Sequence, residues 1–426
     1  MPDLVVVGAG PAGLAAALGA ADEGARAEVV EGAPEPGGAA PLSNGSLWTF
    51  DSAETFLARC PGADPAVARR VTGGLGSVVA WLRREGVTVA ERGPSLYGAA
   101  TSHQVSPPEL VAVLAAAVRA RAALTTGDPV TGLARDGAGV RVVCASGREI
   151  AAGAVVVASG GIHGDPALLR AAGLGHYVGL PVRSRPRGGD GVRLATGLGA
   201  TLAGTADGIY GHLVPAGLPP GEVTAPLAAQ YHSSAGVLLG ADGTVVAPVG
   251  TDDHHLNRAL ARTPERRGFL VHDIDAAPPL IRKPVGGASW AADRFAFASE
   301  HGARTARADT LGELLGALGT WGLPPLGAGA RAAVAGVLRT PPFHAVEVTA
   351  SITHAGAGLR VDDGLAVAGV RGVFAAGADI GGAFGDGYGG GLALALTTGL
   401  AAGRRAAAAA RDPRAAGNEE TPWATH

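Results

Sequence analysis

Three glycines and one acid near the start of the chain have the types and spacing that hold a dinucleotide. Gly8, Gly10 and Gly13 match the pattern G-x-G-x-x-G, and Glu31 lies further along the chain. The first glycine permits a tight turn, the second leaves room for a pyrophosphate, and the third allows close packing of helix on strand. A carboxylate at Glu31 can accept hydrogen bonds from both ribose hydroxyls and disfavours a 2′-phosphate. These residues predict a site for an adenine dinucleotide.

The elements that must position these residues follow from the pattern around them. The apolar run Leu4–Val7 predicts a strand, and Ala27–Val30 predicts a second strand that ends at Glu31. The helix between them points its N-terminal N–H groups and its positive dipole end at the phosphate. Because the chain has 69 glycines, the glycine pattern alone could also mark an ordinary βαβ turn. The agreement of strand, helix and acid favours the dinucleotide.

A second glycine-rich segment follows the second strand. It contains Gly37, Gly38, Ser43, Asn44 and Gly45 within a polar stretch. Such a loop brings backbone N–H groups close to a ligand without obstruction by side chains. The alternative is a plain surface loop.

The composition limits the possible classes of protein. With 426 residues, 47% of them hydrophobic and 17% charged, the chain is globular and long enough for two or three domains. A net charge of −3 without a basic block gives no sign of a nucleic-acid partner. Cys60 and Cys144 are too few and too far apart for a disulfide framework or a zinc site, so we expect no metal and a reducing, cytoplasmic location.

One segment approaches the minimum length of a membrane helix. Leu4–Ala21 carries no charged residue, but its glycines and Pro11 stand where a nucleotide-binding turn requires them. No basic region precedes it, as would be the case in a signal peptide. We therefore expect neither a membrane span nor a signal peptide.

The remaining periodicity predicts an α/β chain. Two helices are expected, Pro65–Glu85 and Pro107–Arg121, the second opened by proline. Three short strands joined by Asp-Gly and Ser-Gly turns follow, at Thr131–Arg135, Val140–Cys144 and Glu149–Ile150. They lead into a buried strand at Ala154–Gly161. A βαβ unit, a β-meander and a return strand in this order are typical of the glutathione-reductase-like FAD-binding Rossmann domain.

Four further motifs resemble one family. They are ASGG at Ala158–Gly161, GGDGVRLATGLGATLAG at Gly188–Gly204, THAGAGLRVD at Thr353–Asp362, and the glycine-rich segment GVFAAGADIGGAFGDGYGGGLALALTTG from Gly372. In this order they resemble the fumarate reductase/succinate dehydrogenase flavoprotein family, and the resemblance runs to about Ala408. Within that family the chain is most similar to tricarballylate dehydrogenase and ketosteroid dehydrogenase-like members.

The resemblance implies a division into domains. It places the FAD-binding domain at residues 1–184 and 344–410, with an inserted α+β cap (substrate) domain at 185–343. Both ends of the insertion are rich in Gly and Pro, as a hinge would be. Val373–Gly377 is expected as a sheet strand, Gly390–Ala410 as the last helix, and residues 411–426 as a flexible tail.

The family also implies the cofactor and the residues around it. The cofactor is FAD, held non-covalently, because no histidine stands between Ala39 and Ser43, where family members attach the flavin. The glycines from Gly389 open the last helix, whose dipole can stabilise the reduced flavin. The expected FAD-binding residues are Gly8, Gly10, Pro11, Ala12, Gly13, Glu31, Gly37, Gly38, Ser43, Asn44, Gly45, Ala158, Ser159, Gly160, Gly377, Ala378, Asp379, Gly390, Gly391 and Leu392.

Three candidate catalytic residues are assigned by resemblance. His354 and His212 stand where the family has substrate-binding histidines, and Tyr388 stands where fumarate reductases place an arginine that clamps a carboxylate. A phenol lacks the bidentate fork of arginine, so strict fumarate reduction is not expected. Tyr388 could polarise a carbonyl, act as acid/base or simply pack, and either histidine could be an ordinary core residue.

The largest departure from the family lies in TDDHHLNR, Thr251–Arg258. Where fumarate reductases carry the proton-delivering arginine, the register points to Asp253 or His254. An aspartate and histidine together can supply a base near neutral pH, and a solvated polar loop is the alternative. His232 replaces a second arginine of the family's proton path.

The predicted function is an FAD-dependent desaturation, or the reverse ene-reduction, of a C–C bond next to a carbonyl or carboxyl group. The expected partners are a small-molecule substrate with such a group and an unknown electron acceptor or donor, without nucleic acid or membrane. Two alternatives remain open: an oxidase or monooxygenase on the same fold, and a degenerate flavin-binding protein that has lost catalysis.

Overall fold

The computed structural model describes residues 1–94, 101–137, 139–183, 189–204, 208–275, 282–284 and 291–411. It divides into two compact units, the first formed by Met1–Leu174, Arg185–Gly208 and Ala355–His426, the second by Gly175–Ser184 and Ile209–His354. The predicted FAD-binding and cap domains are defined by function, whereas these units are defined by compactness. The predicted domain boundaries therefore stay a prediction. The tail expected at 411–426 lies outside the described residues beyond Arg411.

The first unit is built on a five-stranded parallel sheet in the order β22-β10-β1-β2-β6. Its central strands are almost entirely buried, as apolar β-branched runs in a parallel sheet should be. The strands are β1 (Leu4–Val7), β2 (Ala27–Val30), β6 (Ala123–Thr125), β10 (Ala154–Val157) and β22 (Val373–Ala375).

A β-meander lies between the parallel strands β6 and β10 in the chain. Strands β7 (Val130–Asp136), β8 (Gly139–Cys144) and β9 (Glu149–Ala152) pair antiparallel, as predicted. A smaller antiparallel sheet has the order β3-β5-β4, with β3 (Ser46–Leu47), β4 (Ala90–Pro94) and β5 (Thr101–Gln104). The parallel sheet and the meander together confirm the predicted α/β class with a Rossmann-type sheet.

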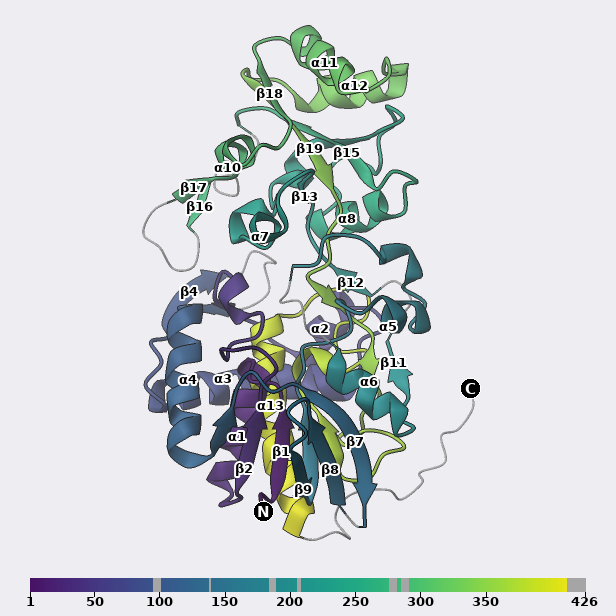
Figure 1. Ribbon diagram of the computed structural model, residues 1–426. Coiled ribbons are helices and arrows are strands. Elements are labelled where there is room, and N and C mark those ends of the chain that lie inside the picture. Colours follow the sequence, from purple (N-terminus) through teal and green to yellow (C-terminus); the bar gives the residue numbers. More distant parts are fainter. Residues whose placement is uncertain are drawn as a thin grey trace. The chain divides into compact units, whose positions relative to one another are not determined.

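The first and last helices of the chain pack directly on each other. In Figure 1 the purple helix α1 (Pro11–Asp22) and the yellow helix α13 (Gly391–Arg411) run beside the sheet. A Cβ on Gly403 would lie 1.9 Å from the carbonyl oxygen of Ala16, and one on Gly399 would lie 2.4 Å from that of Ala12. Glycine at these positions therefore allows the two backbones to approach closely.

The other helices of the first unit begin at recognisable caps. Asp64 accepts hydrogen bonds from two backbone N–H groups at the start of α3, and Pro65 occupies its first turn. These helices are α2 (Ala53–Arg59), α3 (Pro65–Arg84), α4 (Pro107–Arg121), α5 (Pro166–Ala171) and α6 (Asp190–Gly197).

The second unit has an antiparallel sheet covered by two helices. Strands β13 (Val214–Pro215), β19 (Phe343–Thr349), β15 (Arg267–His272) and β14 (Val237–Gly240) follow in that order, and β18 (Thr305–Ala308) also pairs with β19. Helices α11 (Leu311–Thr320) and α12 (Ala328–Val337) bury Leu314, Leu318 and Val334 against Val237, Phe269 and other residues of this sheet. Further helices are α7 (Pro220–Val223), α8 (Asp253–Ala261) and α10 (Arg294–Glu300).

The cysteines and the helices can be compared with the expectations about disulfides and membrane spans. Cys60 and Cys144 are buried free thiols, as predicted, and burial raises the pKa of Cys60 to about 12. Among the described helices, none is long and apolar enough to cross a membrane.

Candidate functional site

The turn from β1 into α1 has the form of a pyrophosphate cradle. Gly8 and Gly13 are held by packing, since a Cβ would lie 2.4 Å from the Ala158 oxygen at Gly8 and 1.9 Å from the Gly8 oxygen at Gly13. At Gly10, by contrast, the nearest atom to an added Cβ is the Gly38 Cα at 3.9 Å. Helix α1 has no side-chain cap, and Pro11 stands in its first turn. Open space beside Gly10 at an uncapped helix N-terminus fits a phosphate.

Glu31 is fixed by the backbone around this turn. Its carboxylate accepts hydrogen bonds from the Ala9 N–H at 2.6 Å and the Ala33 N–H at 2.8 Å. A carboxylate has about four acceptor positions, so two remain for the ribose hydroxyls of FAD. The predicted role of Glu31 is compatible with this orientation.

The glycine-rich loop is tied to the same turn. The Gly37 N–H donates to the Ala9 oxygen at 2.8 Å, and a Cβ on Gly38 would lie 3.2 Å from the Gly10 Cα. Ser43 Oγ accepts from the Gly45 N–H and Asn44 Oδ1 from the Ser46 N–H. The side chains of Ser43 and Asn44 therefore shape the loop, and their contact with FAD stays a prediction.

Asp379 is a buried anchor for the segment that follows β10. Its carboxylate accepts hydrogen bonds from Ser159 Oγ at 3.0 Å, the Gly160 N–H at 3.2 Å and the Gly161 N–H at 2.8 Å. Burial raises the pKa of Asp379, and these hydrogen bonds oppose the shift. Asp379 thus joins Ala158–Gly160 to Gly377–Asp379, two of the segments predicted to bind the cofactor.

Tyr388 caps the helix that the glycine run opens. The Gly391 N–H donates to Tyr388 Oη at 2.8 Å. The Tyr388 ring packs against Phe384, with ring centres 5.0 Å apart, and against Trp48 at 6.1 Å. The phenol oxygen is therefore held at the positive end of α13.

At each of Gly389, Gly390 and Gly391, close packing leaves no room for a Cβ. A Cβ would lie 2.4 Å from the Phe56 ring at Gly389, 1.9 Å from the Trp48 oxygen at Gly390 and 2.8 Å from Tyr388 Oη at Gly391. Their proposed place beneath the flavin stays a prediction, as does that of Leu392.

In the second unit, His212 and Asp253 form a buried hydrogen-bonded pair. His212 Nδ1 lies 2.6 Å from Asp253 Oδ2. The rings of Tyr210 and Tyr231 pack edge-on against the imidazole, with ring centres 4.8 and 4.4 Å away. Burial lowers the pKa of His212 below its ordinary value, and Asp253 opposes only part of that shift. Burial thus favours the neutral imidazole, and in the tautomer that donates from Nδ1 to Asp253 the Nε2 atom carries no proton.

The segment TDDHHLNR is the start of α8, which corrects the alternative of a solvated loop. Asp252 caps the helix by accepting a hydrogen bond from the His255 N–H. It also lies 2.7 Å from His254 Nδ1 and 2.6 Å from His255 Nδ1. Burial raises the pKa of Asp252, but its close contacts with His254 and His255 prevail and hold that pKa well below its ordinary value.

The three side chains of Asp252, His254 and His255 bring possible metal-ligand atoms within 4.8 Å of one another. The absence of a metal, expected from the sequence, stays a prediction. His254 lies beside the His212 pair, since its ring centre is 6.0 Å from that of Tyr210, which also packs on His212.

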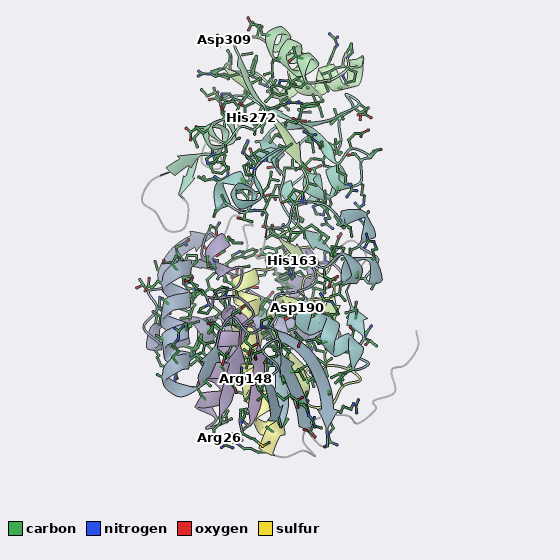
Figure 2. All side chains as sticks on the ribbon, viewed as in Figure 1. Arg26, Arg148, His163, Asp190, His272 and Asp309 are labelled. Atoms are coloured by element: carbon green, nitrogen blue, oxygen red, sulfur yellow. The ribbon has the colours of Figure 1, made fainter. Side chains whose placement is uncertain are left out.

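His354 is buried at the start of β20 (His354–Ala355), at the boundary where the chain passes from the second unit to the first. His232 is completely buried next to His272, with ring centres 4.6 Å apart. Figure 2 labels His272 within the second unit. The structure therefore groups His212, Asp253 and His254, while Tyr388 belongs to the first unit.

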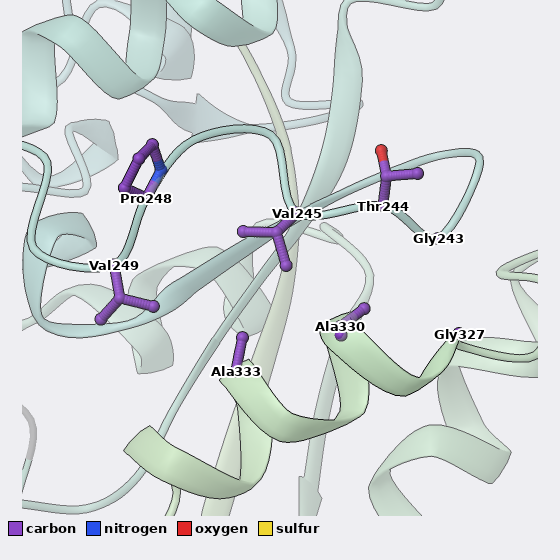
Figure 3. Close-up of a pocket in the computed structure, with 9 residues that line it drawn as sticks. Gly243, Thr244, Val245, Pro248, Val249, Gly327, Ala330 and Ala333 are labelled. Carbon is purple, nitrogen blue, oxygen red and sulfur yellow. The ribbon is translucent and has the colours of Figure 1, made fainter.

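A separate pocket of about 430 Å3 in the second unit is lined by Gly243, Thr244, Val245, Pro248, Val249, Gly327, Gly329, Ala330 and Ala333. The residues labelled in Figure 3 come from the segment after β14, from Gly327 just before α12 and from α12 itself. None of them is titratable, so this pocket offers no acid or base.

The comparisons with known proteins agree with this geometry. A family model described as "FAD binding domain" matches residues 3–392. No curated protein matches the chain.

Solved structures share the fold at low sequence identity. A flavocytochrome c3 fumarate reductase has a TM-score of 0.74 at 21% identity, over 96% of this chain and 79% of that one. A 3-ketosteroid-Δ4-(5α)-dehydrogenase from Rhodococcus jostii RHA1 has a TM-score of 0.71 at 20% identity, over 95% and 96%. A 3-ketosteroid Δ1-dehydrogenase from Sterolibacterium denitrificans has a TM-score of 0.71 at 16% identity, over 96% and 99%. With nearly the whole chain covered by the family model and the cradle present, the chain belongs to the FAD binding domain family, and its cofactor is FAD.

Proposed function

We propose that the protein is an FAD-dependent dehydrogenase or reductase acting on a CH–CH bond next to a carbonyl or carboxyl group. The observation that carries this proposal is the hydrogen bond from the Gly391 N–H to Tyr388 Oη at the start of α13. The similar solved structures support it, since they are those of a fumarate reductase and two 3-ketosteroid dehydrogenases. FAD supplies a hydride acceptor or donor when bound.

The role of Tyr388 is to polarise the carbonyl oxygen. An O–H group that accepts a hydrogen bond becomes a better donor in turn, because hydrogen bonds in a chain polarise one another. The positive end of α13 stabilises negative charge that develops on the oxygen. The C–H bond next to that carbonyl then becomes acidic enough to lose a proton.

The role of His212 is to accept that proton at Nε2. Asp253 holds the Nδ1–H tautomer and stabilises the imidazolium that forms. In the dehydrogenation direction His212 takes one proton from the substrate, and bound FAD would supply the hydride acceptor that formation of the C=C bond requires. His354 is proposed as a further donor to the carbonyl or carboxyl group, and His254 as the second candidate for the base.

The proposal is tested with a panel of ketones and carboxylic acids mixed anaerobically with the holoprotein. We expect a saturated ketone or acid to bleach the flavin absorbance, and Tyr388→Phe and His354→Ala to lower turnover severely without loss of FAD. Tyr177→Phe, a buried tyrosine in another part of the chain, is the matched control. Near-normal turnover of both variants would overturn the placement of the site.

Three further results separate the alternatives. Efficient reduction of fumarate would contradict the reading of Tyr388, which lacks the fork of arginine. Rapid peroxide formation without an added acceptor would favour an oxidase or monooxygenase. A flavin that no substrate bleaches would favour a binding protein without catalysis, which the two replaced arginines also suggest.

A further inference from the structure

Helix α8 carries two buried polar side chains one turn apart, Asp253 and Asn257. Asp253 is 7% exposed and Asn257 is completely buried, and residues four apart lie on the same face of a helix. Asp253 reaches the His212 ring, but the proposed reaction gives Asn257 no part. Because a buried amide is costly unless its hydrogen bonds are made, the partners of Asn257 indicate what it does.

Asn257 binds both backbone groups of one residue, Ser351. Asn257 Nδ2 donates to the Ser351 carbonyl oxygen at 3.0 Å, and Asn257 Oδ1 accepts from the Ser351 N–H at 2.9 Å. Only one orientation of the amide satisfies both bonds, because its oxygen must face the N–H and its NH2 group must face the carbonyl. These two bonds therefore fix Ser351 relative to α8.

Ser351 extends this link to the backbone of His212. Ser351 Oγ donates to the His212 carbonyl oxygen at 2.6 Å, and both residues are buried. The neighbouring Gly211 has no room for a side chain, since an added Cβ would lie 1.9 Å from the Ser351 oxygen and 2.8 Å from Asn257 Nδ2. The backbone before His212 thus packs directly against the contact between Asn257 and Ser351.

One helix therefore holds His212 at two points. Asp253 holds the ring at Nδ1, and Asn257 holds the backbone through Ser351. Since Asp253 and Asn257 belong to the same helix, the spacing of the two points is set by α8. A shift of the His212 backbone would break a buried hydrogen bond and lengthen the contact between Nδ1 and Asp253.

The segment that carries His354 is tied to the same place. The Thr353 N–H donates to the Tyr210 oxygen at 2.9 Å, where β12 (Ile209–Tyr210) pairs with β20. Ser351 stands just before His354 in this segment, so the bonds to Ser351 also restrain the approach to that histidine.

We infer that Asn257 is a positioning residue, which acts through Ser351 to hold His212 where Asp253 accepts its Nδ1–H hydrogen bond. A catalytic group must be held within about 0.5 Å of its working position, by neighbours that are themselves fixed. This inference rests on the proposed function, in which His212 is the base, and adds the residues that hold this base in place.

The position of His212 is measured without turnover, by NMR of the FAD-loaded protein labelled with 15N-histidine. The Nδ1 proton in the bond to Asp253 is identified as the resonance that His212→Gln removes. In Ser351→Ala we expect this resonance to move upfield and the proton to exchange faster with water, because a longer hydrogen bond to the carboxylate is weaker.

Ser233→Ala is the matched control. Ser233 is also completely buried in the second unit, but its Oγ has no hydrogen-bond partner among the described residues, so this variant should keep the wild-type resonance. Asn257→Leu removes both bonds to Ser351 and should displace the resonance further; if it does not retain FAD, Ser351→Ala decides alone. An unchanged His212 resonance in Ser351→Ala, or in a folded Asn257→Leu protein, would overturn the inference.

Turnover of the substrate that bleaches the flavin gives a second readout. Ser351→Ala should lower kcat by about 10- to 100-fold at unchanged KM, because a misplaced base slows the reaction without weakening binding. Asp253 raises the pKa of His212, and less so from further away, so the acid limb of kcat/KM should move to lower pH. The charges of Arg183 and His254, which lower this pKa, stay in place.

A double-mutant cycle then separates positioning from a general effect on the fold. In the Asp253→Asn background, Ser351→Ala should have little further effect on kcat, because both changes act on one contact. Additive losses would show that Ser351 acts outside the pair of His212 and Asp253, and would overturn the inference. If no compound bleaches the flavin, the proposed function fails, whereas the NMR comparison still decides this inference.

Discussion

The glycines of the turn from β1 into α1 divide into two that packing requires and one, Gly10, that we expect the ligand to require. Gly8 and Gly13 have backbone atoms within 2.4 Å of where a Cβ would lie, whereas Gly10 has only open space to 3.9 Å. The free chain can therefore accommodate a methyl group at Gly10, whereas we expect bound FAD to clash with it.

Gly10→Ala should leave the stability of the FAD-free protein unchanged and weaken FAD binding by about ten- to a hundredfold, because the methyl group meets the pyrophosphate. Fluorescence titration of the apoprotein with FAD measures the affinity, and thermal unfolding measures the stability. Gly13→Ala is the comparison and should lower both. An unaltered Kd in Gly10→Ala would show that the pyrophosphate lies elsewhere.

The proposed base His212 and its partner Asp253 can be tested by the pH dependence of the rate. Asp253 raises the pKa of His212 against the stronger effect of burial, so Asp253→Asn should lower that pKa further. Because the base acts in its neutral form, the acid limb of kcat/KM should move to lower pH. The plateau rate should fall by about 10²–10⁴ as the tautomer is lost.

A pH–rate profile of wild type and variant checks this, with Asp252→Asn as a neighbouring control that leaves the His212–Asp253 pair in place. An acid limb that stays fixed or moves to higher pH would assign the base to another residue, with His254 the first candidate.

At the scale of helices and strands, several bounds predicted from the sequence agree with the structure. Helix α4 occupies the predicted Pro107–Arg121, and the three strands of the meander differ from prediction by only a few terminal residues, because local periodicity and proline or glycine signals determine them. The pairing of His212 with Asp253 and the cap that Tyr388 places on α13 depend on contacts that periodicity does not encode. The burial of Arg294 likewise has no local signature, since this residue opens an ordinary helix after a capping aspartate.

The contact between α1 and α13 gives a prediction about an element. Gly403→Ala should lower the free energy of unfolding by about 1–3 kcal/mol, because its Cβ would lie 1.9 Å from the Ala16 oxygen. Gly316→Ala on α11 meets no atom within 4 Å and should raise the stability by up to about 1 kcal/mol. Denaturant titration of both variants makes the comparison, and equal stabilities would contradict the close packing.

At the scale of the whole molecule, family membership and the FAD-binding fold agree with the resemblance read from the sequence. The motifs that carried it lie mainly around the parallel sheet and α13, where backbone geometry restricts the residues. The second unit carries the His212–Asp253 pair, whose roles stay a prediction.

The FAD is predicted to be bound without a covalent link to the chain. We expect denaturation followed by ultrafiltration to release all of the FAD into the filtrate, because no histidine stands between Ala39 and Ser43. Flavin fluorescence that stays with the polypeptide on a denaturing gel would establish a covalent bond instead.

The chain order of the first unit has a consequence for synthesis on the ribosome. Strand β22 pairs with β10, and α13 packs on α1, although the segment Ile209–His354 lies between these partners in the chain. All of the second unit, Gly175–Ser184 and Ile209–His354, is made before β22 and α13, so it can fold while translation continues. The sheet that forms the FAD cradle must wait, with an open edge at β10, until β22 and α13 emerge. A nascent chain stopped before Val373 would therefore expose that edge and retain no FAD.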